Sequence, residues 1–124
     1  YRHYHSILQP LKSKGHIAYP SLEGIEESGA HAFYILLDSS ETREELRAKL
    51  MTAGITAVFH YQPLHRSSYV EAQWGRQPNL PVTEEIAQRL LRLPLYYELN
   101  LSEIEYVAEE IEKFFKNMHQ VKQR

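Results

Sequence analysis

Three side chains that could take part in chemistry lie close together in the middle of the chain: His60, Tyr61 and His65. They follow an apolar run at residues 57–59, and a polar loop begins at Gln62 and Pro63. Binding groups concentrate in loops at the ends of strands, so we expect these donors and acceptors to contact a ligand. The residues alone support a purely structural role equally well. In that case Tyr61 would be half-buried in the core, and the His60 ring would find its hydrogen-bond partners at a sheet edge.

A metal site is a weak explanation for these histidines. His60 and His65 are separated by a strand end, which does not fix the geometry of two ligands, and no carboxylate follows them closely enough to complete a site. His3 and His5 would point to different sides of a helix. We therefore expect no metal ion.

Nucleophilic catalysis has one conceivable arrangement, Ser67 with His65 and Glu71. A triad is recognised by its geometry, which a sequence does not supply, and Ser67 is better explained as the start of a helical turn. Neighbouring glutamates at residues 44–45, 84–85 and 109–110 lie outside the apolar stripes of predicted helices, where we expect them to be solvated. The sequence predicts no catalytic residue.

Strands and helices alternate around this stretch. Residues 30–37 are apolar on both faces, which predicts a central strand covered on both sides. Thr42 and Glu45 match a capping box for a helix that closes at Gly54. The second predicted strand, at residues 55–61, carries the candidate residues at its end.

The flanking segments are mostly helical. An apolar stripe without a preceding cap predicts an exposed helix at residues 1–8, which Pro10 should end or kink. Turn residues predict an irregular connection at 16–29, a short helical or irregular excursion at 64–74 and a loop at 75–79. A helix should begin at Pro81, with a buried stripe that includes Val82, Ile86, Leu90 and Leu91.

The last two predicted elements close the domain. Pro94 favours an edge strand at residues 91–95, and Ser102 with Glu105 opens an amphipathic helix that reaches Met118. The sum is an α+β domain: a small two- to three-stranded sheet, antiparallel or mixed, with helices packed on one face.

Composition narrows the possible functions. The 124 residues suit one domain, and 43% hydrophobic content can fill its core. With a net charge of −2 and interspersed signs, the sequence offers no basic face large enough for a nucleic-acid backbone, so we expect no nucleic-acid partner. The lack of cysteine excludes disulfides and thiolate sites. No apolar run of about 18 residues exists, so we expect no membrane span. The cysteine-free composition fits a cytoplasmic location, which we expect.

Two blocks of the sequence resemble the C-terminal domain of the DegT/DnrJ/EryC1/StrS sugar aminotransferases. The first is Phe59-His60-Tyr61 followed by Pro63-Leu64-His65, and the second is the segment 89–95. Segments 31–37, 43–54 and 80–84 extend the resemblance to nearly the whole chain. Within the family, the sequence is most similar to the branch of dTDP-4-oxo-6-deoxy-D-glucose transaminases.

The resemblance implies an activity, a cofactor and partners. Such enzymes are fold-type-I aminotransferases, usually homodimers, that use pyridoxal 5'-phosphate to move an amino group from glutamate to a nucleotide-linked 4-keto-6-deoxy sugar. The implied pathway is of the lipopolysaccharide or enterobacterial common antigen type. Residues 1–15 would be the tail of an inter-domain helix and its turn, and residues 16–124 the small domain, with the N-terminal cofactor domain missing.

The resemblance also implies roles for the candidate residues. His60, Tyr61 and His65 carry over as contacts to the sugar nucleotide or to the active-site walls, where they would orient the substrate. The cofactor needs a lysine for its Schiff base, and none lies in the family's context. The lysines are Lys12, Lys14, Lys49, Lys113, Lys116 and Lys122. We therefore expect this chain alone to bind no cofactor and to be inactive.

Two other functions remain open at this point. One is a free-standing α+β ligand-binding or dimerisation module that pairs through some of its nine tyrosines. The other is a small independent enzyme that uses His60 and His65 as acid and base. The sequence offers these histidines no partner carboxylate at a meaningful spacing, so this function ranks last. The sequence preceding Tyr1 would discriminate between these functions and the aminotransferase domain.

Overall fold

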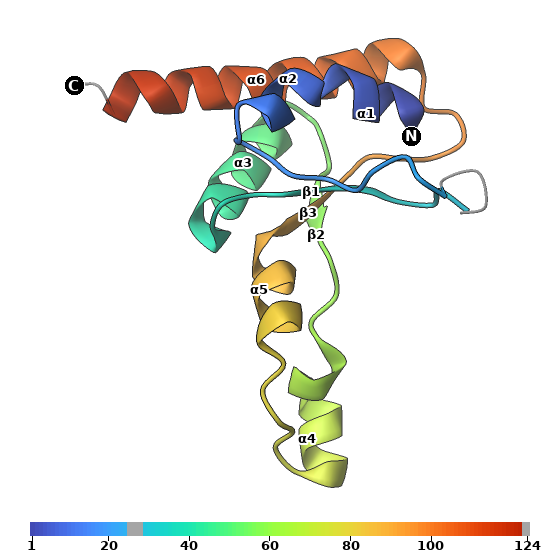
Figure 1. Cartoon of the computed structure of the whole chain (residues 1–124), viewed down its shortest axis with the longest axis vertical. Coiled ribbons are helices and arrows are strands. Elements are labelled where there is room, and N and C mark those ends of the chain that lie inside the picture. Colours follow the sequence, from blue (N-terminus) through green and yellow to red (C-terminus); the bar gives the residue numbers. More distant parts are fainter. Residues whose placement is uncertain (25–28, 123–124) are drawn as a thin grey trace.

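A three-stranded antiparallel sheet lies at the centre of the molecule (Figure 1). The computed structural model describes residues 1–24 and 29–122, so part of the irregular connection expected at 16–29 lies outside the described residues. The strands are β1 (Phe33–Leu36), β2 (Val58–Phe59) and β3 (Leu90–Leu93), in the spatial order β1-β3-β2. The α+β class and the small sheet are confirmed.

The main helices gather on one side of this sheet. They are α1 (Arg2–Ile7), α2 (Gln9–Ser13), α3 (Ser40–Thr52) and α6 (Leu101–Lys122). Both α1 and α3 pack against α6, which runs along the top of the molecule in Figure 1. No helix in the described ranges is both long and apolar enough to cross a membrane.

The core lies between the sheet and these helices. The register pairs Phe33 with Leu93 and Ile35 with Leu91, which puts all four side chains on one buried face. The predicted stripe of α6 covers this face through Ile104, Val107, Ala108, Ile111 and Phe115.

The first helix belongs to the same core. The ring of Tyr4 stacks on that of Phe33 with centroids 5.0 Å apart, and Leu8 is fully buried beside it. The expected exposed stripe at residues 1–8 is therefore wrong, because α6 and the sheet cover it. Pro10 does interrupt the helix as expected, in the first turn of α2.

The strand order differs from the sequence prediction. β1 is an outer strand, flanked on its free side only by a short bridge between Leu36 and Ala18, and β3 is the central strand. Pro94 does not force β3 to the edge, because it follows Leu93, the last residue of β3 to pair with β1. The missing N–H of Pro94 therefore interrupts no ladder bond.

Both predicted capping boxes are displaced towards the N-terminus. Ser39 caps α3, since its hydroxyl accepts from the backbone N–H of Thr42 at 3.1 Å. At α6, the Asn100 side chain accepts from the N–H of Glu103 at 3.0 Å, and the Glu103 carboxylate accepts from the N–H of Asn100 at 2.9 Å. Gly54 follows α3 with a φ of 76°, as the helix stop required.

One predicted solvated glutamate is buried instead. Glu110 of α6 is 7% exposed, and its carboxylate accepts from Lys113 at 2.7 Å and lies 3.9 Å from Lys49 of α3. The hydrogen bond with Lys113 is the main cause that lowers the Glu110 pKa. Pairing to two ammonium groups offsets the cost of removing this carboxylate from water.

Phe33 should carry a large share of the core's stability, because three tyrosine rings contact it within 5.6 Å. We expect Phe33→Ala to lower the free energy of unfolding by about 3–5 kcal/mol, through lost contacts and the cavity left behind. Urea denaturation measures this. Tyr97 is fully exposed, so Tyr97→Ala should stay within about 0.5 kcal/mol. Equal losses in the two variants would contradict this description of the core.

Candidate functional site

Residues 60–89 form a projecting segment, which we call the arm. It contains the turn η1 (Leu64–Arg66), α4 (Ser68–Trp74) and α5 (Pro81–Arg89), and Figure 1 shows α4 and α5 on the opposite side of the sheet from α6. The helical excursion, the loop after it and the helix start at Pro81 are confirmed. No residue of the arm is buried, so the predicted burial of Val82 and Ile86 is wrong. Leu90 and Leu91, which belonged to the same predicted stripe, are buried, but they lie in β3.

Two arginines attach the arm to the domain. The guanidinium of Arg43 in α3 donates to the carbonyl of Ala87 at 3.2 Å, and that of Arg89 donates to the carbonyl of Leu37 at 2.7 Å. These charge-assisted hydrogen bonds hold the end of α5 next to the sheet.

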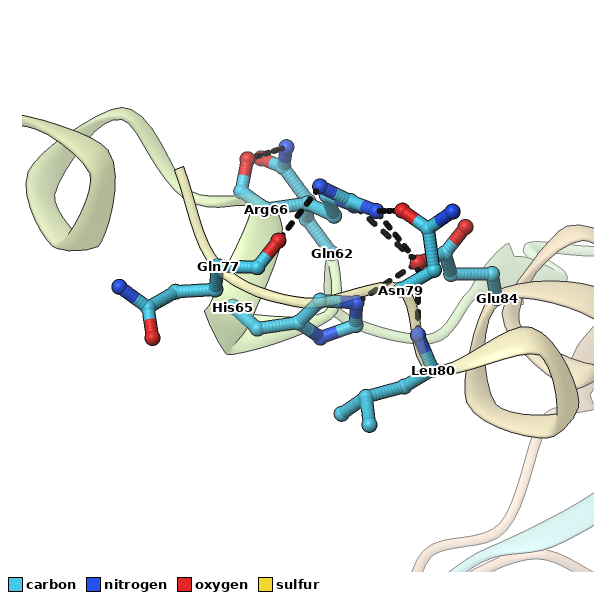
Figure 2. Close-up of polar contacts among 7 residues, drawn as sticks. All are labelled: Gln62, His65, Arg66, Gln77, Asn79, Leu80 and Glu84. Carbon is cyan, nitrogen blue, oxygen red and sulfur yellow. Dashed lines mark hydrogen bonds and ion pairs between the residues drawn. The ribbon is translucent and has the colours of Figure 1, made fainter. Parts of the chain in front are cut away.

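Glu84 is the centre of the arm's polar contacts (Figure 2). Its Oε1 accepts from His65 Nε2 at 2.9 Å, from Arg66 Nη2 at 2.9 Å and Nε at 3.1 Å, and from the backbone N–H of Leu80 at 3.2 Å. The expectation of a freely solvated Glu84 is therefore wrong. The Glu84 side chain is 30% exposed and lies between the imidazole of His65 and the guanidinium of Arg66.

Arg66 extends these contacts across the arm. Its guanidinium donates to the carbonyl of Gln77 at 3.3 Å and to the side-chain oxygen of Asn79, while its own carbonyl accepts from Gln62 Nε2 at 2.6 Å (Figure 2). The chain on both sides of α4 is thereby joined at one place. We call the contacts among His65, Arg66, Asn79, Leu80 and Glu84 the Glu84 clamp.

The clamp keeps the Glu84 carboxyl ionised. The hydrogen bond from His65 is the largest cause, followed by those from the Leu80 amide and Arg66, and together they lower the pKa of Glu84 from 4.5 to about 2. An ionised carboxylate can only accept hydrogen bonds. The proton of the His65–Glu84 contact therefore resides on His65 Nε2.

The predicted site residues occupy two places on the arm. The rings of His60 and Tyr61 are exposed, 5.1 Å apart, and line one side of a mainly apolar groove of about 540 Å³. The rest of the lining includes Val82, Thr83, Ile86 and Ala87 of α5 and Leu90 at the start of β3. His65 is turned away into the clamp, where its side chain is 12% exposed. The structure thus brings His60 and Tyr61 together but does not place His65 in the groove.

The other arrangements considered from the sequence have ordinary structural explanations. Ser67 caps α4, since its hydroxyl accepts from the N–H of Val70 at 3.2 Å, which confirms the helical turn. His3 faces Glu105 whereas the His5 ring meets Tyr19, so these two histidines do point to different sides. A carboxylate does approach His65, contrary to expectation, but no group of three or more potential metal ligands exists among the described residues.

The arm does not fit a pyridoxal cofactor. Its Schiff base needs a lysine in a pocket, whereas the arm contains no lysine. Four lysines are engaged elsewhere: Lys12 with the Tyr19 carbonyl, Lys49 and Lys113 with Glu110, and Lys116 with Glu112. The polar side chains of the arm are groups that can form hydrogen bonds to a ligand.

Sequence reasoning missed Arg66, Asn79 and Glu84. Glu84 lies 19 residues from His65, so no local periodicity connects them. One signal was present: an acidic residue shortly after a proline at the helix start can reach back to the amide that precedes the helix. The bond from the Leu80 amide to Glu84 is of this kind.

The depressed pKa of Glu84 makes a pH-dependent prediction. A carboxyl whose folded-state pKa is lowered stabilises the fold above its ordinary pKa of 4.5, and this contribution is lost as the pH falls through about 2. A carbon-13 NMR titration of the Glu84 carboxyl should give a midpoint of about 2. His65→Ala should raise that midpoint, whereas His60→Ala should leave it unchanged. A midpoint near 4.5 in the unaltered chain would contradict the clamp.

Two curated relatives align with most of the chain. The dTDP-4-dehydro-2,3,6-trideoxy-D-glucose 4-aminotransferase of Saccharopolyspora spinosa is 28% identical over 118 residues, which cover 95% of this chain and 26% of the relative. A pleiotropic regulatory protein of Geobacillus stearothermophilus is 31% identical over 88 residues, covering 70% of this chain and 24% of that protein. The chain thus spans about a quarter of the length of these relatives.

Solved structures share the fold. NtdA from Bacillus subtilis, determined with bound PMP, has a TM-score of 0.80 and 28% identity, covering 93% of this chain and 26% of that one. PseC from Helicobacter pylori is an aminotransferase involved in pseudoaminic acid biosynthesis. Its TM-score is 0.75 at 20% identity, and the match covers 94% of this chain and 32% of PseC. At this identity the match shows a shared fold.

A family model extends over most of the sequence. It matches residues 1–112, which include both strands that frame the arm, the whole Glu84 clamp and the start of the long helix. The chain belongs to the DegT/DnrJ/EryC1/StrS aminotransferase family.

Proposed function

We propose that this chain is the small C-terminal domain of a larger sugar aminotransferase and forms one wall of its substrate cleft. The observation that carries the proposal is the arm, whose thirty residues include none that is buried. It exposes seven large apolar side chains: Tyr61, Leu64, Tyr69, Trp74, Leu80, Val82 and Ile86. Apolar surface concentrated in this way is typical of a face that contacts another protein surface.

The partner of this face is a cofactor domain that precedes residue 1 in the longer enzyme. Three observations support that partner: the chain matches about a quarter of each curated relative, the arm contains no lysine, and the arm carries an apolar groove among its exposed residues. Residues 1–15 would join the two domains, with the small domain at residues 16–124. The intact enzyme would be a cytoplasmic homodimer.

The substrates follow from the family. Glutamate would supply the amino group, and a nucleotide-linked 4-keto-6-deoxy sugar of a lipopolysaccharide or common antigen pathway would accept it. Pyridoxal 5'-phosphate would supply the electron sink for this transfer from the cofactor domain. A relative named as a dTDP-keto-sugar aminotransferase, at 28% identity, supports this substrate class.

The residues of this chain would bind and orient the sugar nucleotide. His60 and Tyr61 present an imidazole and a phenol at the rim of an apolar groove, where they can hydrogen-bond to polar groups of a ligand whose apolar faces lie against Val82 and Ile86. His65 would contact the ligand from the clamp. Holding the keto carbon in one place lowers the barrier through positioning, without any bond being broken by this domain.

The chain alone should neither bind the cofactor nor transaminate. Adding pyridoxal 5'-phosphate to the purified 124-residue chain should produce no Schiff-base absorbance band, and incubation with glutamate and a dTDP-4-keto-6-deoxy sugar should yield no amino sugar. The longer enzyme serves as the positive control in both assays. A band that survives dialysis and disappears on borohydride reduction would overturn the proposed division between the two domains.

In the longer enzyme, His65→Ala should weaken use of the sugar nucleotide while leaving cofactor binding intact. Loss of one hydrogen bond to the ligand predicts about a tenfold rise in KM for the sugar. Steady-state kinetics and the cofactor absorbance measure the two effects separately. The matched control is His31→Ala, which changes an exposed histidine outside the arm. Kinetics equal to those of the control would remove His65 from the proposed site.

A further inference from the structure

The hydrogen bond between His65 and Glu84 determines which nitrogen of the imidazole ring is a hydrogen-bond acceptor. Its Nε2 lies 2.9 Å from an ionised Glu84 carboxylate, so Nε2 carries a hydrogen. A neutral imidazole has only one N–H, and its second nitrogen is then a lone-pair acceptor. The clamp therefore selects one of the two neutral tautomers of His65, with Nδ1 as the acceptor.

The orientation of the ring keeps that acceptor out of the clamp. In Figure 2, the second ring nitrogen of His65 points away from Glu84 and Arg66. Among the described residues, Nε2 is the only ring nitrogen of His65 that forms a hydrogen bond. The side chain is 12% exposed, so only a small part of the ring faces solvent.

The charges around His65 indicate which chemical class Nδ1 can bind. Arg66 and Glu84 neutralise each other, so the clamp carries no net charge while His65 is neutral. A lone-pair acceptor in a site without net charge suits a hydroxyl donor better than a phosphate.

We propose that Glu84 is a positioning residue that fixes the tautomer of His65, so that Nδ1 accepts a hydrogen bond from a sugar hydroxyl. The identity of the ligand rests on the proposed function, but the tautomer and its dependence on Glu84 do not. Arg66 belongs to the clamp itself, because its guanidinium donates hydrogen bonds to Glu84, Gln77 and Asn79.

The tautomer can be measured on the 124-residue chain. Long-range proton–nitrogen NMR spectra distinguish a hydrogen on Nε2 from one on Nδ1, and His65→Gln identifies the His65 signals. At a pH well above the ordinary imidazole pKa of about 6.5, we expect the Nε2–H form in the unaltered chain and in Glu85→Ala. Glu85 is the matched control, because it pairs with Arg89 and not with His65.

Changing Glu84 should release this preference. Glu84→Ala should give a mixture of tautomers, and Glu84→Gln should largely restore the Nε2–H form, because an amide oxygen still accepts from Nε2–H. The Nδ1–H form in the unaltered chain would overturn the inference, as would a tautomer that does not respond to Glu84→Ala. Neither result depends on what the enzyme acts on.

A pair of substitutions at His65 separates the two ring nitrogens in the longer enzyme. Gln places its amide where Nε2 lies and keeps a donor for Glu84, whereas Asn places its amide where Nδ1 lies and keeps an acceptor for the ligand. We expect His65→Gln to raise KM for the sugar nucleotide about tenfold with little change in kcat, and His65→Asn to raise it less. Glu84→Ala should raise KM and Glu84→Gln should recover most of the loss.

The two assays distinguish failure of the inference from failure of the proposed function. The Nε2–H tautomer together with unchanged KM in every His65 and Glu84 variant would support the positioning by Glu84 and remove the sugar contact. Equal effects of His65→Gln and His65→Asn on KM, with normal cofactor absorbance, would overturn the role of Nδ1 while leaving the substrate-cleft proposal standing.

Discussion

A single carboxylate oxygen, Oε1 of Glu84, determines the shape of the arm. It accepts from a histidine, an arginine and a backbone amide that lie on both sides of α4. The arm has no buried side chain, so hydrophobic burial cannot fix its conformation. Charge-assisted hydrogen bonds supply geometric definition, but partly exposed pairs contribute only modestly to stability. The arm is thus defined in shape by its clamp and still has apolar surface to bury against a partner.

The domain divides stability from binding. Tyr4, Phe33 and Leu91 build a closed core between the sheet and the helices, while His60, Tyr61 and His65 lie beyond it on the arm. Arg43 and Arg89 connect the two parts through carbonyls at the end of α5 and after β1. A rigid scaffold that carries its binding groups on an attached segment is a common arrangement, because those groups can change without disturbing the packing.

The sequence predicted what local chemistry controls. Pro81 begins a helix, Gly54 follows one, and the apolar spacing of α6 marks its buried face. It did not predict features in which distant residues compete. Pro94 suggested an edge strand, yet pairing with both β1 and β2 makes β3 central. Ser39 and Asn100 cap α3 and α6 in place of the expected Thr42 and Ser102, because their side chains accept from the first free amides of each helix. Likewise, residue type and position made His60 and His65 candidates, whereas the Glu84 clamp depends on a contact across 19 residues that no sequence period encodes.

The most direct measurement is a structure of the longer enzyme with a nucleotide-linked keto sugar bound. We predict that the arm faces the cofactor domain with the sugar nucleotide between them, and that a sugar hydroxyl lies within hydrogen-bonding distance of His65 Nδ1 while Nε2–H still donates to Glu84. An arm that stays exposed to solvent, with the sugar bound away from His60, Tyr61 and His65, would contradict it.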